Sequence, residues 1–309
     1  MKYGIIGIII LLSFHSGNCQ STTAAVSDTH LTKNLKILSW NIYMLPAIVK
    51  VKGRADRAGA IGNILSKSDY DIIVFQEAFH LRARRKILKQ LKTAFPYQTG
   101  PANKKILSCR TNSGLWIFSK YPITNSYTMM FESRAGIDAF SRKGGLLAEI
   151  MVNNKLIQVV GTHLQSSGGD WIRHSQCVEF YHKLLKEHAR PGIPQIICGD
   201  FNINRKNEDV YNQMLNILGA TDGTLSGEST FSYDPSHNDM NNNKDIAPHL
   251  IDYILLRNNE LGTVNCLQRK ICIFRHSWNT AHADLSDHFA MEAELQIHDE
   301  KIASLESYR

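Results

Sequence analysis

Cysteine is scarce in this chain, and no hydrophobic run reaches the roughly 18 residues that a membrane-spanning helix needs. The 309 residues include six Cys, with no CxxC pair and no Cys/His spacing typical of a zinc site. A disulfide-dense mini-protein is therefore excluded. Internal repeats and low-complexity linkers are also absent. With 43% apolar and 20% charged residues, the composition excludes a disordered chain, a coiled coil and a collagen-like fibre. What remains is a globular protein large enough to bury a sizeable core.

The N-terminus is typical of a secretory signal peptide. Lys2 precedes an apolar run over residues 4–12, and small polar residues follow as far as Cys19. The run is too short to span a bilayer. We therefore predict that residues 1–18 are a signal peptide and that the protein is exported. A buried N-terminal strand is the alternative interpretation, although the run lacks the polar alternation of the later strands.

Cys19 lies where a bacterial lipoprotein signal would place its lipidated cysteine. Asn18, directly before it, does not match the small residue that is usual there. Full secretion and a lipid anchor at Cys19, outside the cytoplasm in either case, therefore both stay open. Beyond the signal peptide we predict a linker over residues 19–33, one large domain over residues 34–298 and a C-terminal tail over residues 299–309.

The chain carries a modest basic excess, with a formal net charge of +7. Lys2 is the one charged residue in the predicted signal peptide, so nearly all of this excess belongs to the mature protein. Such an excess suits nucleic acid or an anionic membrane and does not choose between them. Its densest cluster, residues 82–86, lies among leucines at helical spacing, which favours the exposed face of an amphipathic helix over a binding patch.

The cysteines beyond Cys19 are odd in number, so they cannot all pair within the chain. Cys198 lies inside an apolar run and is predicted to be a buried thiol. Cys266 and Cys272 flank five residues, and in an exported protein they could close a small disulfide loop.

Extended and helical patterns alternate along the chain. Apolar or alternating runs predict strands over residues 35–40, 71–75, 114–118, 146–152, 156–161, 195–198, 251–256 and 289–295. Helical spacing predicts helices over residues 54–67, 80–93, 171–189 and 207–218. Strands that alternate with helices, but also follow one another directly, predict a layered α/β domain with mixed sheets. One long polar loop, residues 222–243, interrupts the pattern, and loops of this length are usually functional or mobile.

Polar side chains stand at the ends of these predicted strands. They are Asn41, Gln76-Glu77, Thr162-His163, Asp200 with Asn202, Asp252 and Ser286-Asp287-His288. Each alone has a simpler explanation, since Asp and Asn cap helices and make turns, and a lone His is often structural. A layered sheet would gather all of them along one edge. Together they predict a site whose hard oxygen ligands suit Mg²⁺ better than zinc.

The order of these motifs resembles that of the endonuclease/exonuclease/phosphatase superfamily. The motifs are Ser39-Trp40-Asn41, Gln76-Glu77, Thr162-His163, Gly199-Asp200-Phe201-Asn202 and Ser286-Asp287-His288. The resemblance covers nearly all of residues 35–297. It implies a four-layer α/β sandwich, in which two packed mixed sheets are flanked by helices as in DNase I, and metal-dependent cleavage of a phosphate ester.

Finer features are similar to the neutral sphingomyelinases, phosphodiesterases of the sphingomyelinase C type. They are Asn41-Ile42-Tyr43-Met44-Leu45-Pro46, Lys143-Gly144, Thr162-His163-Leu164-Gln165-Ser166, Ser232-Tyr233-Asp234-Pro235 and His249-Leu250-Ile251-Asp252-Tyr253. This resemblance implies hydrolysis of sphingomyelin, or a related phosphosphingolipid, to ceramide and phosphocholine at a sphingomyelin-containing membrane. We expect a monomer. A secreted Mg²⁺-dependent nuclease, a phosphatase of the same fold and a binding module without catalysis are the alternatives, with nucleic acid the less favoured partner.

Two segments depart from the pattern of that family. Residues 166–177 lack the acidic run that often follows this His motif, so a disulfide cannot be carried over there. Residues 270–278 hold Phe274 and Trp278 where secreted members carry an exposed aromatic hairpin for lipid surfaces. Membrane insertion and core packing of these two aromatics both stay open.

The resemblance also implies a role for each candidate residue. Glu77 and Asn41 would hold the divalent cation, Mg²⁺ or another hard ion such as Mn²⁺ or Co²⁺, with Asp287 as an additional partner. His288 would be the general base that activates water, since imidazole titrates near neutral pH. Asp252 is the candidate for the carboxylate that orients this imidazole.

The remaining candidates would act on the phosphate and the leaving group. Asp200 and Asn202 are expected to orient the water or the phosphate. His163 is expected to stabilise the transition-state charge or to assist the leaving alkoxide. The metal-binding and orienting roles of Asp200 and Asp287 could be exchanged.

Overall fold

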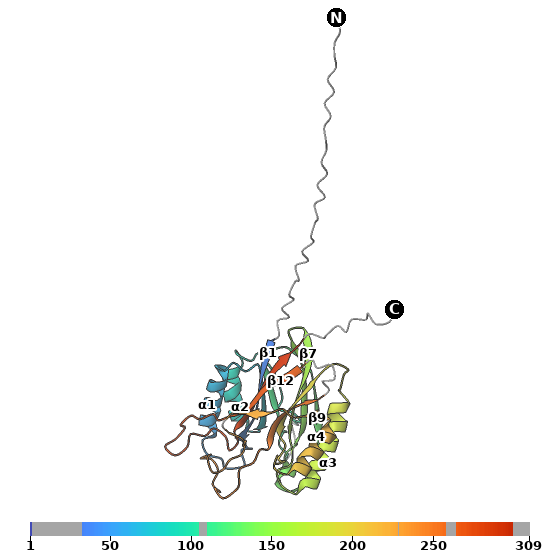
Figure 1. Cartoon of the computed structure of the whole chain (residues 1–309). Helices are drawn as coiled ribbons and strands as arrows, with labels where there is room; N and C mark the ends of the chain where they lie inside the picture. The colour runs from blue at the N-terminus through green and yellow to red at the C-terminus, as the bar shows by residue number, and fades with distance from the viewer. Residues whose placement is uncertain (2–32, 105–109, 228, 258–263, 299–309) are drawn as a thin grey trace. The chain divides into compact units, whose positions relative to one another are not determined.

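The computed structural model describes Met1 and residues 33–104, 110–227, 229–257 and 264–298 (Figure 1). The predicted signal peptide (residues 1–18), Cys19, Cys109 and the predicted tail (residues 299–309) lie outside these ranges, as does the predicted linker apart from Lys33. Their boundaries stay predictions. Within the described part of the chain, no helix combines the length and the hydrophobicity needed to cross a bilayer.

Seven strands form the first sheet, in the order β10-β12-β13-β1-β2-β4-β3. They are β1 (Lys33–Met44), β2 (Ile72–Ala78), β3 (Tyr97–Thr99), β4 (Trp116–Ser119), β10 (Leu225–Ser226), β12 (Val264–Cys272) and β13 (Ala290–Ile297). Alternation along β1 separates its two faces. Leu35 and Ile37 enter the core between the sheets, whereas Leu38, Trp40 and Ile42 belong to the core under the first helix layer.

Six strands form the second sheet, in the order β5-β6-β7-β8-β11-β9. They are β5 (Ile123–Met130), β6 (Gly144–Val152), β7 (Lys155–His163), β8 (Gln195–Asp200), β9 (Ala220–Thr221) and β11 (Asp252–Arg257). Both β7 and β8 are buried over most of their length and read as continuous apolar runs, as expected for parallel central strands.

Helices cover the outer face of each sheet. They are α1 (Arg54–Ser66), α2 (Leu81–Leu91), α3 (Asp170–Phe180) and α4 (Glu208–Leu218), with a 3₁₀ turn η1 (Gly136–Phe140) and a π-helical turn η2 (Tyr181–Lys186) that continues α3. In Figure 1, α1 and α2 lie on one side of the sheets, and α3 and α4 lie on the other. The four-layer sandwich of two mixed sheets is therefore confirmed, and the four predicted helices fall within a few residues of these bounds.

Two long strands escaped the sequence prediction. β5 is mostly exposed at the edge of its sheet and has the polar sequence Ile-Thr-Asn-Ser-Tyr-Thr-Met-Met. β12 buries few side chains and contains a register shift between Cys266 and Gln268. Neither strand shows clean apolar alternation, because edge and bulged strands do not need it.

One sequence-based expectation is wrong in the structure, and a second holds only in part. Cys266 and Cys272 are free thiols on the same strand, and six extended residues hold them about 20 Å apart, so no disulfide loop closes between them. The exposed helix face predicted for residues 82–86 is confirmed at Arg82, Arg85 and Lys86. Arg84 is instead buried and donates to the carbonyl oxygens of Ala78 and Phe79 at 2.7 and 2.6 Å.

The two aromatic residues considered for membrane insertion pack against the core. The ring of Phe274 lies 5.0 Å from that of Trp40, measured between centroids. Trp278 is half-buried, and its indole N–H donates to the Asp284 carbonyl oxygen at 2.9 Å. Between the two interpretations left open by the sequence, core packing is the one that the structure supports.

Arg57, on α1, joins the two ends of the domain's sequence. Its guanidinium is fully buried and donates to the carbonyl oxygens of Ile42 (3.1 Å), Leu285 (2.8 Å) and Tyr43 (2.8 Å). Burial lowers the pKa of Arg57 to about 10, and it therefore remains a cation at neutral pH. The loop after β1 is thereby fastened to the segment that precedes β13.

Replacing Arg57 with Met should lower the free energy of unfolding by about 3 kcal/mol or more, because three buried carbonyl groups lose their donor. Urea unfolding followed by circular dichroism measures the loss. Arg85→Met, at an exposed position on α2, is the matched control and should change it by less than about 0.5 kcal/mol. A loss below about 1 kcal/mol for Arg57→Met would contradict this account.

Candidate active site

Strand register brings three of the candidate residues together. On the parallel pair β7 and β8, His163 lies opposite Asp200. On the antiparallel pair β8 and β11, Asp252 lies opposite the same Asp200. Across the other sheet, Asn41 on β1 lies opposite Gln76, one residue before Glu77 on β2. The polar strand ends therefore do meet at one edge of the sandwich.

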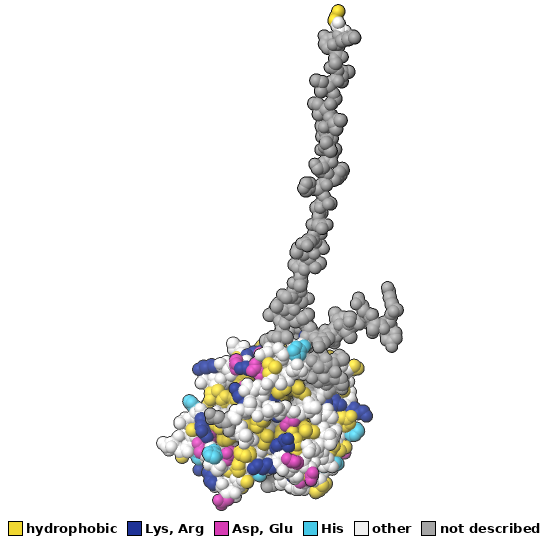
Figure 2. All heavy atoms as spheres, viewed as in Figure 1, with side chains coloured by type: hydrophobic (Ala, Val, Ile, Leu, Met, Phe, Trp, Pro, Cys, Tyr) yellow, Lys and Arg dark blue, Asp and Glu magenta, His cyan; other side chains and the backbone are white. Residues whose placement is uncertain are grey.

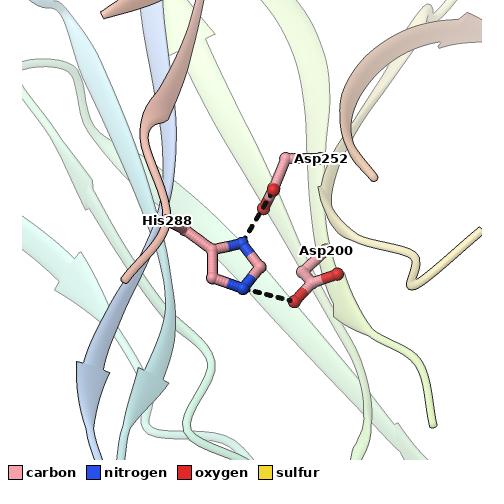
Figure 3. A group of neighbouring side chains, drawn as sticks. All are labelled: Asp200, Asp252 and His288. Atoms are coloured by element: carbon pink, nitrogen blue, oxygen red, sulfur yellow. Dashed lines mark hydrogen bonds and ion pairs between the residues drawn. The ribbon is translucent and has the colours of Figure 1, made fainter. Parts of the chain in front are cut away.

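His288 stands between two carboxylates (Figure 3). Its Nδ1 is 2.9 Å from Oδ2 of Asp252, and its Nε2 is 3.8 Å from Oδ2 of Asp200. Burial alone would lower the pKa of His288, but the charges of Asp252 and Asp200 outweigh burial and raise it well above the usual value. The Asp252 carboxylate fixes the proton on Nδ1, which leaves Nε2 as the atom that faces Asp200 and the cleft.

His163 is paired with a buried lysine. Its Nε2 lies 3.1 Å from Nζ of Lys143, which also donates to the Leu164 carbonyl oxygen (2.9 Å) and to Oδ2 of Asp138 (3.0 Å). An ammonium group can only donate, so Nε2 accepts and the ring proton sits on Nδ1. Burial and the Lys143 charge lower the pKa of His163 to about 3. His163 is therefore neutral at physiological pH.

Two acidic side chains, Glu77 and Asp287, face the same cleft. Burial, followed by the nearby charge of Asp287, raises the pKa of Glu77 to about 8. Burial likewise raises the pKa of Asp287. Within the described residues, Oε2 of Glu77 is buried without a hydrogen-bond partner. Without a cation, the raised pKa values favour a protonated carboxyl group at this end of β2, and a bound cation would replace that proton.

Asn41 and Asn202 hold Asp200 from two sides. The Asn41 amide donates to Oδ2 of Asp200 at 3.1 Å, and its own oxygen accepts from the Tyr43 backbone N–H at 3.2 Å. The Asn202 backbone N–H donates to Oδ1 of Asp200 at 2.9 Å, and its side chain donates to the Leu164 carbonyl oxygen. Asn41 thus contacts Asp200 but does not line the cleft. Asn202 contacts Asp200 and also lines the cleft.

Backbone strain gathers around these residues. Tyr43, Glu77 and Asn202 adopt left-handed conformations, with φ of 48°, 56° and 52°. A non-glycine residue in this region costs on the order of 1 kcal/mol or more and persists where the surrounding structure enforces it. At Glu77 this turn ends the apolar run of β2 and brings the carboxylate into the cleft.

The cleft measures about 420 Å³, enough for a phosphate ester with a small head group. Six candidate residues line it, namely Glu77, His163, Asp200, Asn202, Asp287 and His288. Asp252 and Asn41 lie behind them. The lining also includes residues that were not among the sequence candidates, namely Ser166, Arg173, Asn204, Tyr233, Ile246, His249 and Ile251.

Some of the missed residues carried a sequence signal. Three of them or their neighbours lie in motifs that resemble the neutral sphingomyelinases, namely Lys143, Tyr233 and His249. The motifs alone assign none of these three a role in the site. The ring of Tyr233 lies 5.1 Å from that of His288, and its backbone pairs with that of His249. Arg173, on α3, had no such signal, because a cation on an amphipathic helix looks like an exposed one.

Two groups of side chains could hold a cation. Ligand atoms of Asp200, Asp252 and His288 lie within 4.8 Å of one another, which fits a metal ion by distance. However, both ring nitrogens of His288 already face carboxylates, and a metal on Nε2 would occupy the nitrogen that faces the cleft while Nδ1 kept its 2.9 Å bond to Asp252. The unsatisfied Glu77 oxygen beside Asp287 fits a hard cation without breaking a bond. Both groups could hold a cation, and Glu77 with Asp287 is the one that leaves Nε2 of His288 free.

The sequence profile of the Endonuclease/Exonuclease/phosphatase family matches residues 38–288, which is most of the chain and spans every candidate residue. The chain belongs to this family. A phosphodiesterase hydrolase of the family would use the buried carboxylates, imidazoles and cation site just described, and the distant homologues below support a metal-dependent phosphodiesterase.

Two curated relatives cover most of the chain. Phospholipase C of Staphylococcus aureus is 26% identical over 92% of this chain and 93% of its own length. Sphingomyelinase C of Bacillus cereus is 26% identical over 82% of this chain and 85% of its own length. Among solved structures, a beta toxin variant from Staphylococcus aureus with bound magnesium ions is 27% identical, with a TM-score of 0.77 over 84% of this chain and 99% of that one.

Replacing Glu77 with Gln should abolish stabilisation by magnesium, because the variant lacks the anionic ligand. In the wild type, Mg²⁺ should raise the Tm in a concentration-dependent way, as measured by thermal unfolding. Without the metal, the variant should be as stable as the wild type or more stable, since the repulsion between Glu77 and Asp287 is gone. Glu187→Gln, at an exposed position, is the control that keeps the response. An equal Mg²⁺ response in Glu77→Gln would refute the assignment.

Proposed function

We propose that the protein is a metal-dependent phosphodiesterase that hydrolyses sphingomyelin, or a closely related phosphosphingolipid, to ceramide and phosphocholine. The observation that carries the proposal is the Asp252–His288 pair at 2.9 Å, whose free Nε2 faces the cleft that Glu77 and Asp287 also line. The choice of a sphingolipid is supported by the Bacillus cereus and Staphylococcus aureus relatives and by the motifs around Tyr43, Tyr233 and His249.

His288 acts as the general base in this proposal. The neutral ring, with its proton on Nδ1, accepts a proton at Nε2 from a water molecule while the oxygen of that water attacks phosphorus. Because the pKa of His288 is raised, this neutral form becomes more populated as the pH rises. The negative charge of Asp252 stabilises the imidazolium that forms and keeps the ring oriented. Asp200, fixed by Asn41 and Asn202, faces the same nitrogen and can orient the attacking water.

The opposite side of the cleft serves the phosphate and the leaving group. His163 is neutral and lines this side of the cleft, where its contact with Lys143 lets the pair stabilise the charge that develops on the leaving group. The Lys143 ammonium keeps Nε2 occupied and adds positive charge close to the phosphate. As the ester bond to the ceramide oxygen breaks, the alkoxide takes a proton from solvent water, and the His288 imidazolium returns its proton to the hydroxide that remains. Magnesium, bound by Glu77 and Asp287, would supply charge neutralisation on the non-bridging phosphate oxygens.

A nuclease of the same fold is the main alternative. The face in Figure 2 mixes basic, acidic and hydrophobic side chains and gathers no continuous basic patch of the kind that tracks a nucleic acid backbone. We further propose that the protein acts as a monomer outside the cytoplasm, either secreted or anchored through Cys19, as its N-terminal sequence predicts.

Substrate choice can be tested with one purified protein and two substrates in parallel. Sphingomyelin vesicles and supercoiled plasmid are offered with Mg²⁺, and with EDTA as the metal-free control. We expect phosphocholine release that stops in EDTA, and intact plasmid. Plasmid nicking that weakens steeply with salt, without phosphocholine release, would instead establish the nuclease.

Replacing His288 with Ala should lower kcat roughly 10²–10⁴-fold at saturating Mg²⁺, because the water loses its general base. Phosphocholine release from sphingomyelin measures the loss. His276→Ala removes an exposed imidazole and should leave the rate unchanged. If His288→Ala keeps more than a tenth of the wild-type rate, another group must be the base.

A further inference from the structure

Two aromatic side chains on this molecule are strongly exposed. Phe140 is 68% exposed and Trp171 is 69% exposed, the largest values for aromatic residues in the described part of the chain. A single exposed apolar residue is ordinary and needs no explanation. These two are different because Trp171 stands on a segment that borders the catalytic cleft and Phe140 stands on a segment hydrogen-bonded to it.

Trp171 lies in the first turn of α3, directly after the glycine pair Gly168-Gly169. Two residues further on, Arg173 lines the cleft and donates to the Gln165 carbonyl oxygen at 3.3 Å. The connection from His163 to α3 is therefore the cleft rim on this side. Trp171 belongs to this rim and lies outside the catalytic group itself.

Phe140 is the last residue of η1, and η1 is bound to the same rim. Oδ2 of Asp138 accepts from the backbone N–H and the hydroxyl of Ser166, at 2.8 and 2.9 Å. The Gln165 side chain donates to the Ala135 carbonyl oxygen at 2.8 Å. Ser166 itself lines the cleft. Hydrogen bonds therefore hold the segments carrying Phe140 and Trp171 together as one rim.

The occupant of this rim must leave the cleft open and must also deliver substrate to it. A protein seated across both segments would cover the mouth of the cleft. A lipid surface meets both requirements, since its head groups can enter the open cleft while the rim rests on the lipid layer. Trp and Phe favour the boundary between head groups and acyl chains. Inside the cleft, the apolar Ile246 is also 38% exposed.

We propose that Phe140 and Trp171 insert into the head-group layer of a lipid bilayer and hold the cleft against it. The proposal rests on the proposed function for the identity of the lipid. It also assigns docking to the η1 and α3 rim instead of to Phe274 and Trp278, which are packed against the core.

Vesicle binding tests the proposal without turnover. His288→Ala protein is sedimented with vesicles of equal parts phosphatidylcholine and sphingomyelin, in EDTA, alone and combined with Phe140→Ala or Trp171→Ala. Each added substitution should weaken binding roughly tenfold, and both together should weaken it more. Leu267→Ala is the matched control, because Leu267 is 49% exposed on β12, away from the cleft, and should not alter binding.

Turnover separates docking from catalysis. In the active protein, with His288 intact, Phe140→Ala and Trp171→Ala should raise the KM for vesicle sphingomyelin. The same substitutions should leave the hydrolysis of a water-soluble short-chain sphingomyelin unchanged. Vesicle binding equal to that of the control would overturn the proposal. So would a concentration-dependent dimer, seen by sedimentation velocity, that Trp171→Ala dissolves, since a second copy would then be the occupant. If the wild type binds vesicles through this rim but hydrolyses neither substrate, the proposed function fails and the docking surface stands.

Discussion

The crowding of acidic side chains around one cleft is the constraint on which the rest of this site depends. Glu77, Asp200, Asp252 and Asp287 bring four carboxyl groups to adjoining strand ends, and their mutual repulsion and burial must be offset. The protein offsets the charge of these four groups unevenly. His288 balances Asp252 and Asp200, and Asn41 and Asn202 satisfy Asp200 with hydrogen bonds. Among the described residues Oε2 of Glu77 has no partner, and Asp287 accepts only a 3.3 Å bond from the Ser286 hydroxyl, so a cation would complete this pair.

Holding that charge in place requires contacts between distant parts of the sequence. The Trp40 indole donates to the His288 carbonyl oxygen at 3.0 Å, and the Ser286 hydroxyl donates to the Asn41 carbonyl oxygen at 2.6 Å. Arg57 adds its three bonds across the same junction. The first and last motifs of the domain therefore form one surface only when β1 pairs with β13. The site is a product of the whole sandwich, and no shorter segment would assemble it.

The sequence predicts the site best where a buried apolar strand ends in polar residues. Buried central strands such as β7 and β8 show apolar runs, and the polar residues at their ends were found because they interrupt those runs. Lys143 was missed as a site residue because its partner His163 is close only through the pairing of β6 with β7. The disulfide between Cys266 and Cys272 was wrongly allowed because spacing does not reveal that both lie on one extended strand. Exposure of Phe140 and Trp171 likewise depends on packing that no local pattern records.

The position of the cation tests the central claim most directly. Crystals soaked in Mn²⁺ and measured at a wavelength where manganese scatters anomalously would locate the ion without reference to activity. This account predicts an anomalous peak within bonding distance of the Glu77 and Asp287 carboxylates, with the bond from His288 to Asp252 intact. A peak bonded instead to Asp252 and His288 would contradict it, because a ring nitrogen that binds the metal cannot take the proton that Asp252 stabilises.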